Sequence, residues 1–117
     1  NLGGKSLKIF VDDIRVVEGF DYIAKDAKDF FDFCRENNVK YIELLSLDHD
    51  LGDSDALTGY DIVKCLPELN LSIGTIQFHT ANPIGFKNML IYAKNLKKHN
   101  VMNIDKIISV RVDSRDM

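Results

Sequence analysis

The sequence has no tryptophan, two prolines and two cysteines among its 117 residues. The cysteines, Cys34 and Cys65, form no CxxC pair and fall in segments with helical periodicity. We therefore expect reduced core thiols rather than a disulfide framework or a zinc site. No apolar run approaches the roughly 20 residues that span a bilayer, and no signal peptide precedes the domain. These absences predict a cytoplasmic protein with no membrane contact.

The chain also lacks an excess of positive charge. Its 15 Lys and Arg residues stand against 18 Asp and Glu residues, a formal net charge of −3. Nonspecific nucleic-acid binders usually carry a basic imbalance, so there is no strong nucleic-acid-binding signature. The length indicates one domain, which we place at residues 7–112. We expect residues 1–6 to be a disordered or artificial start and residues 113–117 a short tail. No pattern indicates the oligomeric state.

Runs of strand length alternate with amphipathic helical segments. The strand runs are 7–11, 20–24, 41–47, 73–78 and 106–110. The helical segments follow three N-cap residues, Asp26, Thr58 and Asn82. This alternation predicts a three-layer α/β fold of flavodoxin or receiver type with a mostly parallel five-stranded sheet.

The connection at residues 12–21 is short for a parallel crossover, which usually contains a helix. Either the first crossover helix is reduced to a loop, or the second strand pairs in an unusual way. A last helix is also missing after the fifth strand. We therefore expect the first and last helices to be reduced or absent.

Polar side chains come directly after three of the strands. In an open parallel sheet, ligands bind at the carboxyl ends of the strands. If the first, third and fourth strands are neighbours, these groups converge on one crevice. The first strand is followed by Asp12, Asp13 and Arg15, the third by Asp48, His49 and Asp50, and the fourth by His79, Thr80 and Asn82.

Clustered carboxylates repel one another unless a cation or a proton compensates their charge. Carboxylate oxygens, without cysteines or several histidines, favour Mg²⁺ or Mn²⁺ over Zn²⁺. The sequence thus predicts a metal site formed by Asp12, Asp13 and Asp48. Asp50 is expected to contribute to it or to position a metal-bound water.

The remaining residues suit phosphate chemistry. Arg15 offers a fork for phosphate oxygens, and Thr80 and Asn82 offer further hydrogen bonds. His79 is suited to acid–base catalysis, with His49 as its partner. Simpler roles stay open, because His79 could be a satisfied core histidine and His49 could only cap or pack. Asn82 is expected to cap a helix whatever else it does.

These positions resemble the receiver domains of two-component response regulators. The resemblance rests on Asp12-Asp13, on Asp48, on Gly59 at a helix start and on Thr80. In that family the first acidic pair binds Mg²⁺, the strand-three Asp accepts a phosphoryl group, and the strand-four Ser or Thr responds. After strand five a receiver carries Lys, then usually Pro, where this chain has Ser109-Val110-Arg111. The missing lysine normally holds the phosphoryl oxygens.

The sequence is more similar to the family called the cyclic-phosphate processing receiver domain. Four motifs carry this similarity: Asp12-Asp13-Ile14-Arg15, Leu47 to Gly52, Thr58-Gly59-Tyr60-Asp61 and His79 to Gly85. Several blocks in the right order are more specific than one short motif. The resemblance implies processing of a cyclic or nucleotide phosphate. The substrate would be a phosphate-containing small molecule or an RNA end with a cyclic phosphate.

We hypothesise a metal-dependent phosphoesterase, with an aspartyl-phosphate at Asp48 as a mechanistic variant. A different class of function is a non-enzymatic module in which Asp48 is phosphorylated or a nucleotide only binds. A third reading is a structural domain that binds no divalent ion.

Overall fold

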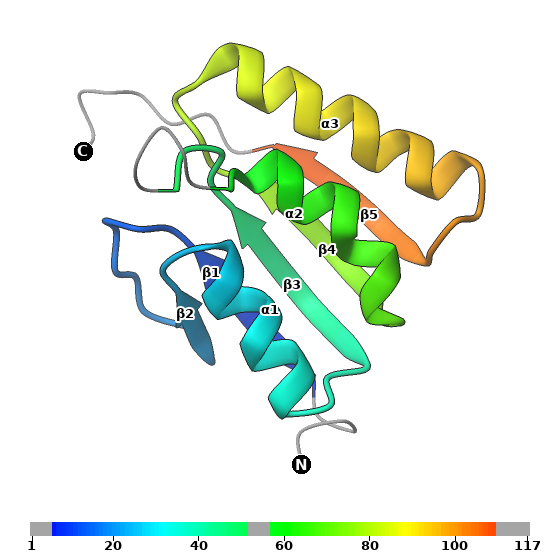
Figure 1. Ribbon diagram of the computed structural model, residues 1–117. Coiled ribbons are helices and arrows are strands. Elements are labelled where there is room, and N and C mark those ends of the chain that lie inside the picture. Colours follow the sequence, from blue (N-terminus) through cyan, green and yellow to red (C-terminus); the bar gives the residue numbers. More distant parts are fainter. Residues whose placement is uncertain (1–5, 52–56, 110–117) are drawn as a thin grey trace.

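The computed structural model describes residues 6–51 and 57–109. Figure 1 shows the path of the chain through a single sheet and its helices. In chain order the elements are β1 (Leu7–Val11), β2 (Tyr22–Ala24), α1 (Ala27–Glu36), β3 (Tyr41–Leu47), α2 (Gly59–Cys65), a short 3-10 helix η1 (Leu66–Leu69), β4 (Ser72–Phe78), α3 (Pro83–Lys98) and β5 (Ile104–Ser109).

The sheet has five strands in the order β2-β1-β3-β4-β5, and every neighbouring pair is parallel. The flavodoxin or receiver-like fold is therefore confirmed, with β1, β3 and β4 as neighbours. β2 lies parallel beside β1, so the short first connection is a crossover without a helix. Residues 12–21 form a loop instead.

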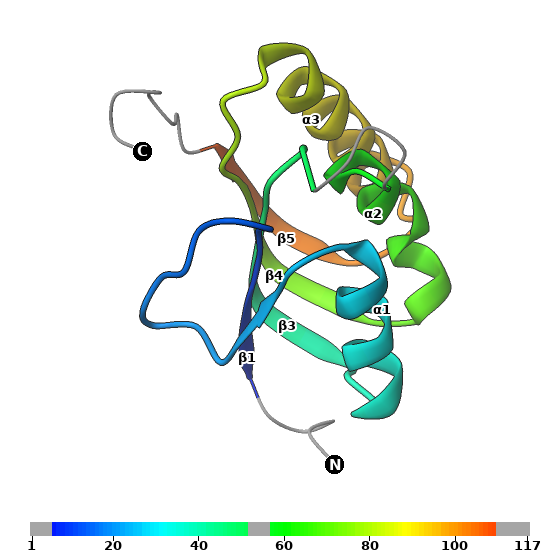
Figure 2. The same cartoon turned by 60° about the vertical axis from the view of Figure 1, so that its left-hand side comes forward.

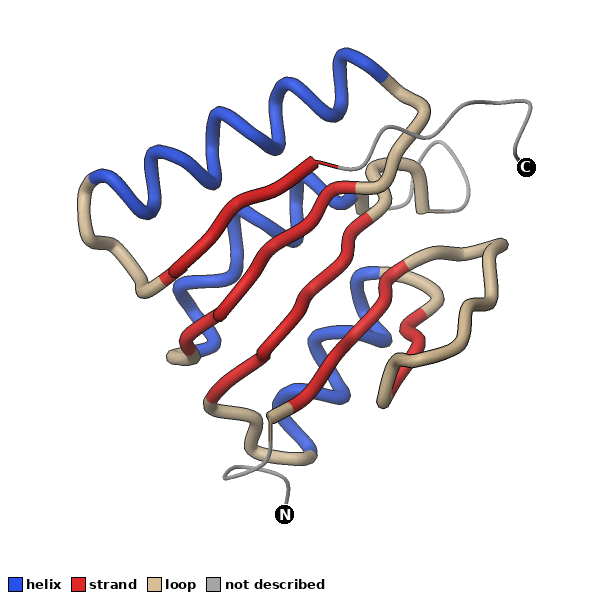
Figure 3. The backbone as a smooth tube through the Cα atoms, turned by 180° about the vertical axis from the view of Figure 1, so that it is seen from behind, coloured by secondary structure: helices blue, strands red, loops and turns tan. Residues whose placement is uncertain are grey.

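All three α-helices lie on one face of the sheet. Figure 2 shows the sheet nearly edge-on with the helices on one side, and Figure 3 shows the strands from the other side with no described helix in front of them. Within residues 6–51 and 57–109, the second helical layer of the predicted three-layer arrangement is absent. The missing crossover helix accounts for this, because a β1–β2 helix would lie on that face. The loop at residues 12–21 lies on that side instead (Figure 2).

Local sequence explains where the helices begin. Asp26 caps α1 by accepting a hydrogen bond from the N–H of Asp29. Thr58 and Asp61 form a capping box at the start of α2, in which each side chain accepts from the other residue's backbone N–H. Pro67 falls in the first turn of η1, so the α-helix ends before it and the chain tightens into a 3-10 turn. The predicted cap residues are confirmed.

Three strand starts differ from the prediction, and the smallest difference is in β4, which begins at Ser72 rather than at Ile73. β2 begins at Tyr22 rather than at Phe20, because the Phe20 ring packs against Phe10, with 5.1 Å between the ring centroids. β5 begins at Ile104, which pairs with Ile73 and is buried in the core. The predicted end of β5 at residue 110 lies outside the described residues. Among the described helices, none is long and apolar enough to cross a bilayer.

Candidate metal centre

The carboxyl ends of β1, β3 and β4 are held side by side by backbone hydrogen bonds that continue past the strands. The N–H of Asp48 donates to the carbonyl of Val11 over 3.0 Å, and the N–H of His79 donates to the carbonyl of Leu47 over 2.9 Å. The first polar residue after each of the three strands is thus fixed against its neighbour. The carboxyl ends of β1, β3 and β4 therefore converge, as predicted from the strand pattern.

Asp12 is the most deeply buried of the predicted site residues, with an exposed fraction of 2%. Its Oδ1 accepts the backbone N–H groups of Ile14 and Arg15, and its Oδ2 lies 3.1 Å from Nε2 of His79. The guanidinium of Arg15 is 3.5 Å from the same Oδ2. Burial alone would raise the pKa of Asp12, but these hydrogen bonds outweigh it and lower the pKa below its ordinary value. Asp12 is therefore a carboxylate at neutral pH.

Asp48 has the opposite shift. Its pKa is raised, first by burial and then by the negative charge of Asp12, although a hydrogen bond from Thr80 opposes the change. The backbone N–H of His49 donates to its Oδ1 over 2.7 Å. Hydrogen bonds thus stabilise the charged form of Asp12, whereas the charged form of Asp48 lacks sufficient compensation. A bound cation would supply that compensation.

His79 is held from three sides. Its exposed fraction is 4%, and its ring stacks on Phe10 with 4.2 Å between centroids and 7° between planes. Nδ1 lies 2.7 Å from Oγ of Ser46, a residue of β3 with no exposed surface. Ser46 was not among the predicted site residues. The sequence feature that could have identified Ser46 is its position as a lone hydroxyl inside the apolar run from Leu44 to Leu47, two residues before Asp48.

The structure brings together a donor set that differs from the predicted one. Carboxylate oxygens of Asp12 and Asp48 and a ring nitrogen of His79 lie within 4.8 Å of one another. An ion coordinated at about 2.1 Å needs donors at most about 4.2 Å apart, so a slight closure would let these three residues hold one ion. Imidazole in the set shifts the preference from Mg²⁺ toward Mn²⁺ and other transition metals. Asp13 and Asp50, also predicted as ligands, do not belong to this group.

Asp12 and Asp48 line an open pocket of about 730 Å³. The predicted site residues that line it are Asp12, Asp13, Arg15, Asp48, Asp50 and Thr80. Four carboxylates and one guanidinium make the pocket strongly acidic, so a phosphate could enter only together with a cation. Thr80 links the pocket to α3, because its Oγ1 also accepts the backbone N–H of Asn82.

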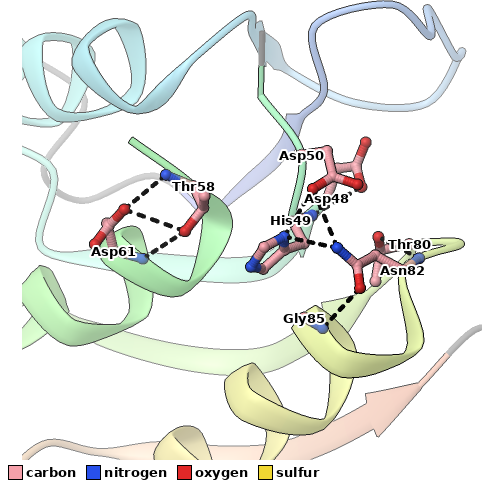
Figure 4. A network of polar contacts seen from close by, with 8 residues as sticks. All are labelled: Asp48, His49, Asp50, Thr58, Asp61, Thr80, Asn82 and Gly85. Atoms are coloured by element: carbon pink, nitrogen blue, oxygen red, sulfur yellow. Dashed lines mark hydrogen bonds and ion pairs between the residues drawn. The ribbon is translucent and has the colours of Figure 1, made fainter. Parts of the chain in front are cut away.

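His49 and Asn82 take part in a second network beside the pocket (Figure 4). The Nδ1 atom of His49 lies 2.9 Å from Oδ1 of Asp50, and Nδ2 of Asn82 donates to the same oxygen over 3.3 Å. The His49 ring is packed so closely on Gly85 that a Cβ there would lie 2.3 Å from its Cγ. The network joins the loop after β3 to the start of α3. The ring of His49 is hydrogen-bonded to Asp50 and Asn82 and not to His79, its predicted partner.

Replacing Asn82 with alanine should destabilise the protein by about 1 kcal/mol, the usual effect of losing an N-cap. Oδ1 of Asn82 accepts the N–H of Gly85 over 2.9 Å, and alanine would leave that donor unpaired. Urea denaturation of Asn82→Ala measures the loss. Asn82→Ser is the control, since serine caps well but is too short to reach Asp50. Equal stability of both variants and the wild type would contradict the capping role.

Comparison with known proteins places these residues in a family. The family model described as "Cyclic-phosphate processing Receiver domain" matches residues 7–95, which include β1 to β4 and every residue of the donor set. Searches of curated proteins and of solved structures return no significant match. The match covers most of the chain and includes the carboxylates after β1 and β3. The chain belongs to the cyclic-phosphate processing receiver domain family.

Proposed function

We propose that this domain is a metal-dependent phosphoesterase that hydrolyses cyclic phosphate or nucleotide phosphate groups. One observation carries the proposal: Asp12, Asp48 and His79 converge within 4.8 Å, and the two carboxylates of this group line a pocket large enough for an organic phosphate. The family description supports a cyclic phosphate as the substrate. When bound, the cation supplies charge neutralisation of the phosphate and a lower pKa for an attacking water.

Each polar residue of the pocket has a part in this chemistry. Asp12 and Asp48 hold the cation, and Asp12 is itself fixed by the N–H groups of Ile14 and Arg15. The guanidinium of Arg15 lies at the pocket side of Asp12, where it can bind phosphate oxygens as a fork. Thr80 also lines the pocket and adds a hydroxyl. Asp13 and Asp50 line the pocket at its rim, where a water-mediated contact with the cation is open to them.

His79 is the group proposed to hold and release the proton. Only its Nε2 faces the carboxylates, because Nδ1 is used by Ser46. Nε2 can bind the cation or carry a proton but cannot do both at once, so in the proposed reaction Asp12 and Asp48 hold the cation and Nε2 of His79 carries the proton. His49 is bound to Asp50 and lies against Gly85, so we assign it to fixing the position of Asp50 rather than to a direct proton transfer.

A thermal melt with metal tests the centre directly. At an ion concentration of 100 times Kd, binding to the folded state alone adds about 2.7 kcal/mol of stability, which is several degrees in Tm for a domain of this size. We expect Mn²⁺ to raise the Tm of the wild type, and Asp48→Asn to lose the rise. Asp105→Asn, at an exposed position of β5 remote from the pocket, is the matched control and should respond as the wild type does.

The metal-free melt provides a second check. Because the folded state raises the pKa of Asp48, ionising it costs stability, and wild-type stability should fall as pH rises through that pKa. Asp48→Asn has no such charge and should lack this loss.

Hydrolysis of a 2′,3′-cyclic nucleotide provides the activity test, and it should disappear in Asp48→Asn and in His79→Ala. A wild-type protein with no metal-dependent change in Tm would contradict the proposal.

A non-enzymatic phospho-acceptor module is the second candidate. It is favoured by the chain of hydrogen bonds from Asp48 through Thr80 to the backbone of Asn82, which connects the acceptor carboxylate to the start of α3. Labelling of Asp48 by beryllofluoride, with no turnover of cyclic nucleotides, would support this function. Turnover that is lost in His79→Ala would exclude it as the sole function.

A further inference from the structure

The pocket has an apolar wall that the metal chemistry does not use. Ile14 and Val16 have exposed fractions of 82% and 83%, the highest among the large apolar side chains in the described part of the chain. Both line the pocket, together with Val17 and Ala81. None of these four residues belongs to the hydrophobic core. They therefore line the pocket beside Asp12 and Asp48 without being part of the packed interior.

The loop that carries this wall is anchored at both ends. At its start, Oδ1 of Asp12 accepts the N–H groups of Ile14 and Arg15 over 2.9 and 2.8 Å. At its other end, Phe20 packs against Phe10, whose ring stacks in turn on His79. The same buried carboxylate thus holds the metal end of the pocket and sets the position of the apolar wall. A ligand that contacts the carboxylates of the pocket therefore lies beside its apolar wall.

The size of the pocket indicates what the wall contacts. Pockets of roughly 300–1,000 Å³ hold organic ligands of drug size. At about 730 Å³ this pocket is far larger than a cation and a phosphate group require. An acidic floor with an aliphatic wall at one side matches a ligand with a phosphate at one end and an apolar surface at the other.

We propose that Ile14 and Val16, with Val17 and Ala81, form a subsite for the organic part of the substrate, an aromatic group of nucleobase size. This inference rests on the proposed function, and it names the class of ester: a phosphate carried by a nucleoside-like group rather than by a small alkyl or acyl group. The wall binds the face of the ring through dispersion and burial of apolar surface. Ile14 and Val16 therefore determine specificity and take no part in the bond-breaking step.

The test compares two ligands on the Mn²⁺-loaded protein: 2′,3′-cyclic AMP and inorganic phosphate, each titrated by calorimetry. We expect the double variant Ile14→Ser/Val16→Ser to bind 2′,3′-cyclic AMP at least about tenfold more weakly, since lost apolar contacts in a pocket change affinity by roughly 10–200-fold. Its affinity for inorganic phosphate and its metal-dependent rise in Tm should equal those of the wild type. Val101→Ser, an exposed apolar residue outside the pocket, is the control and should change neither affinity.

Three outcomes would overturn the subsite. The double variant could bind both ligands as well as the wild type does, or lose both to the same extent, or the wild type could bind the cyclic nucleotide no better than inorganic phosphate. The last result would still allow hydrolysis of small phosphate esters, so it would reject the subsite and not the phosphoesterase. Conversely, a wild type that binds the cyclic nucleotide through Ile14 and Val16 without hydrolysing it would support the subsite and reject the enzymatic function.

Discussion

Gly59→Ala is expected to destabilise the protein by about 3 kcal/mol or more, and to abolish the metal-dependent rise in Tm. A Cβ at this position would lie 2.0 Å from the carbonyl oxygen of Asp48 and 3.0 Å from Sδ of Met89. The methionine side chain can move, but the carbonyl belongs to the backbone that carries the metal-binding carboxylate. The clash can be relieved only by separating α2 from that backbone, a steric defect of the kind that gives large effects.

The sign of the effect makes this substitution informative. Inside a helix, alanine is normally more stable than glycine by roughly 0.5–1 kcal/mol. Gly59 is the first residue of α2, and its N–H donates to the carbonyl of His49 over 2.9 Å, which holds the helix against the loop. A large loss would therefore measure the close approach and not helix propensity.

Urea denaturation, with and without Mn²⁺, measures both parts of the prediction. Lys94→Ala, at an exposed position of α3, is the control and should stay within about 0.5 kcal/mol of the wild type. If Gly59→Ala were as stable as the wild type and still responded to Mn²⁺, α2 would not be packed against Asp48 as closely as described.

Sequence patterns were sufficient where the signal is local. The caps Asp26, Thr58 and Asn82 begin helices because their side chains accept N–H groups two or three residues ahead, which spacing alone predicts. The strands with continuous apolar runs were found for the same reason. Gly59 was placed at a helix start, but its close contact with the backbone of Asp48 is not a local feature of the sequence. The convergence of three strand ends followed from the parallel topology.

What the sequence could not provide is the direction of each side chain. Asp12 and Asp13 are adjacent, yet one is buried against His79 and the other faces the pocket rim, because successive residues leave a strand on opposite sides. His49 follows Asp48 but packs on Gly85, a residue of another element. The pairing of Ser46 with His79 depends on the register between β3 and β4, which spacing along the chain does not reveal.

The hydrogen bonds of His79 lead to the second large effect, in Ser46→Ala. Asp12 is ionised and can only accept, so Nε2 of a neutral His79 carries the proton and donates to Oδ2. Nδ1 is then an acceptor, and the hydroxyl of Ser46 is its donor. Alanine removes that donor from a fully buried position. A buried acceptor left unpaired costs about 1–3 kcal/mol, so Ser46→Ala should lose stability of this order.

The tautomer of His79 distinguishes a positioning role from simple packing. We expect ¹⁵N NMR of the metal-free wild type to show a protonated Nε2 and an unprotonated Nδ1, and Ser46→Ala to change the Nδ1 shift. Ser46→Thr keeps a hydroxyl and should restore the wild-type shifts, even if its extra methyl group lowers stability. Thr75→Ala, at a half-buried position of β4, is the control for loss of a hydroxyl elsewhere in the sheet. A wild-type His79 protonated at Nδ1 alone would contradict the proton arrangement, because the ring could then not donate to Asp12.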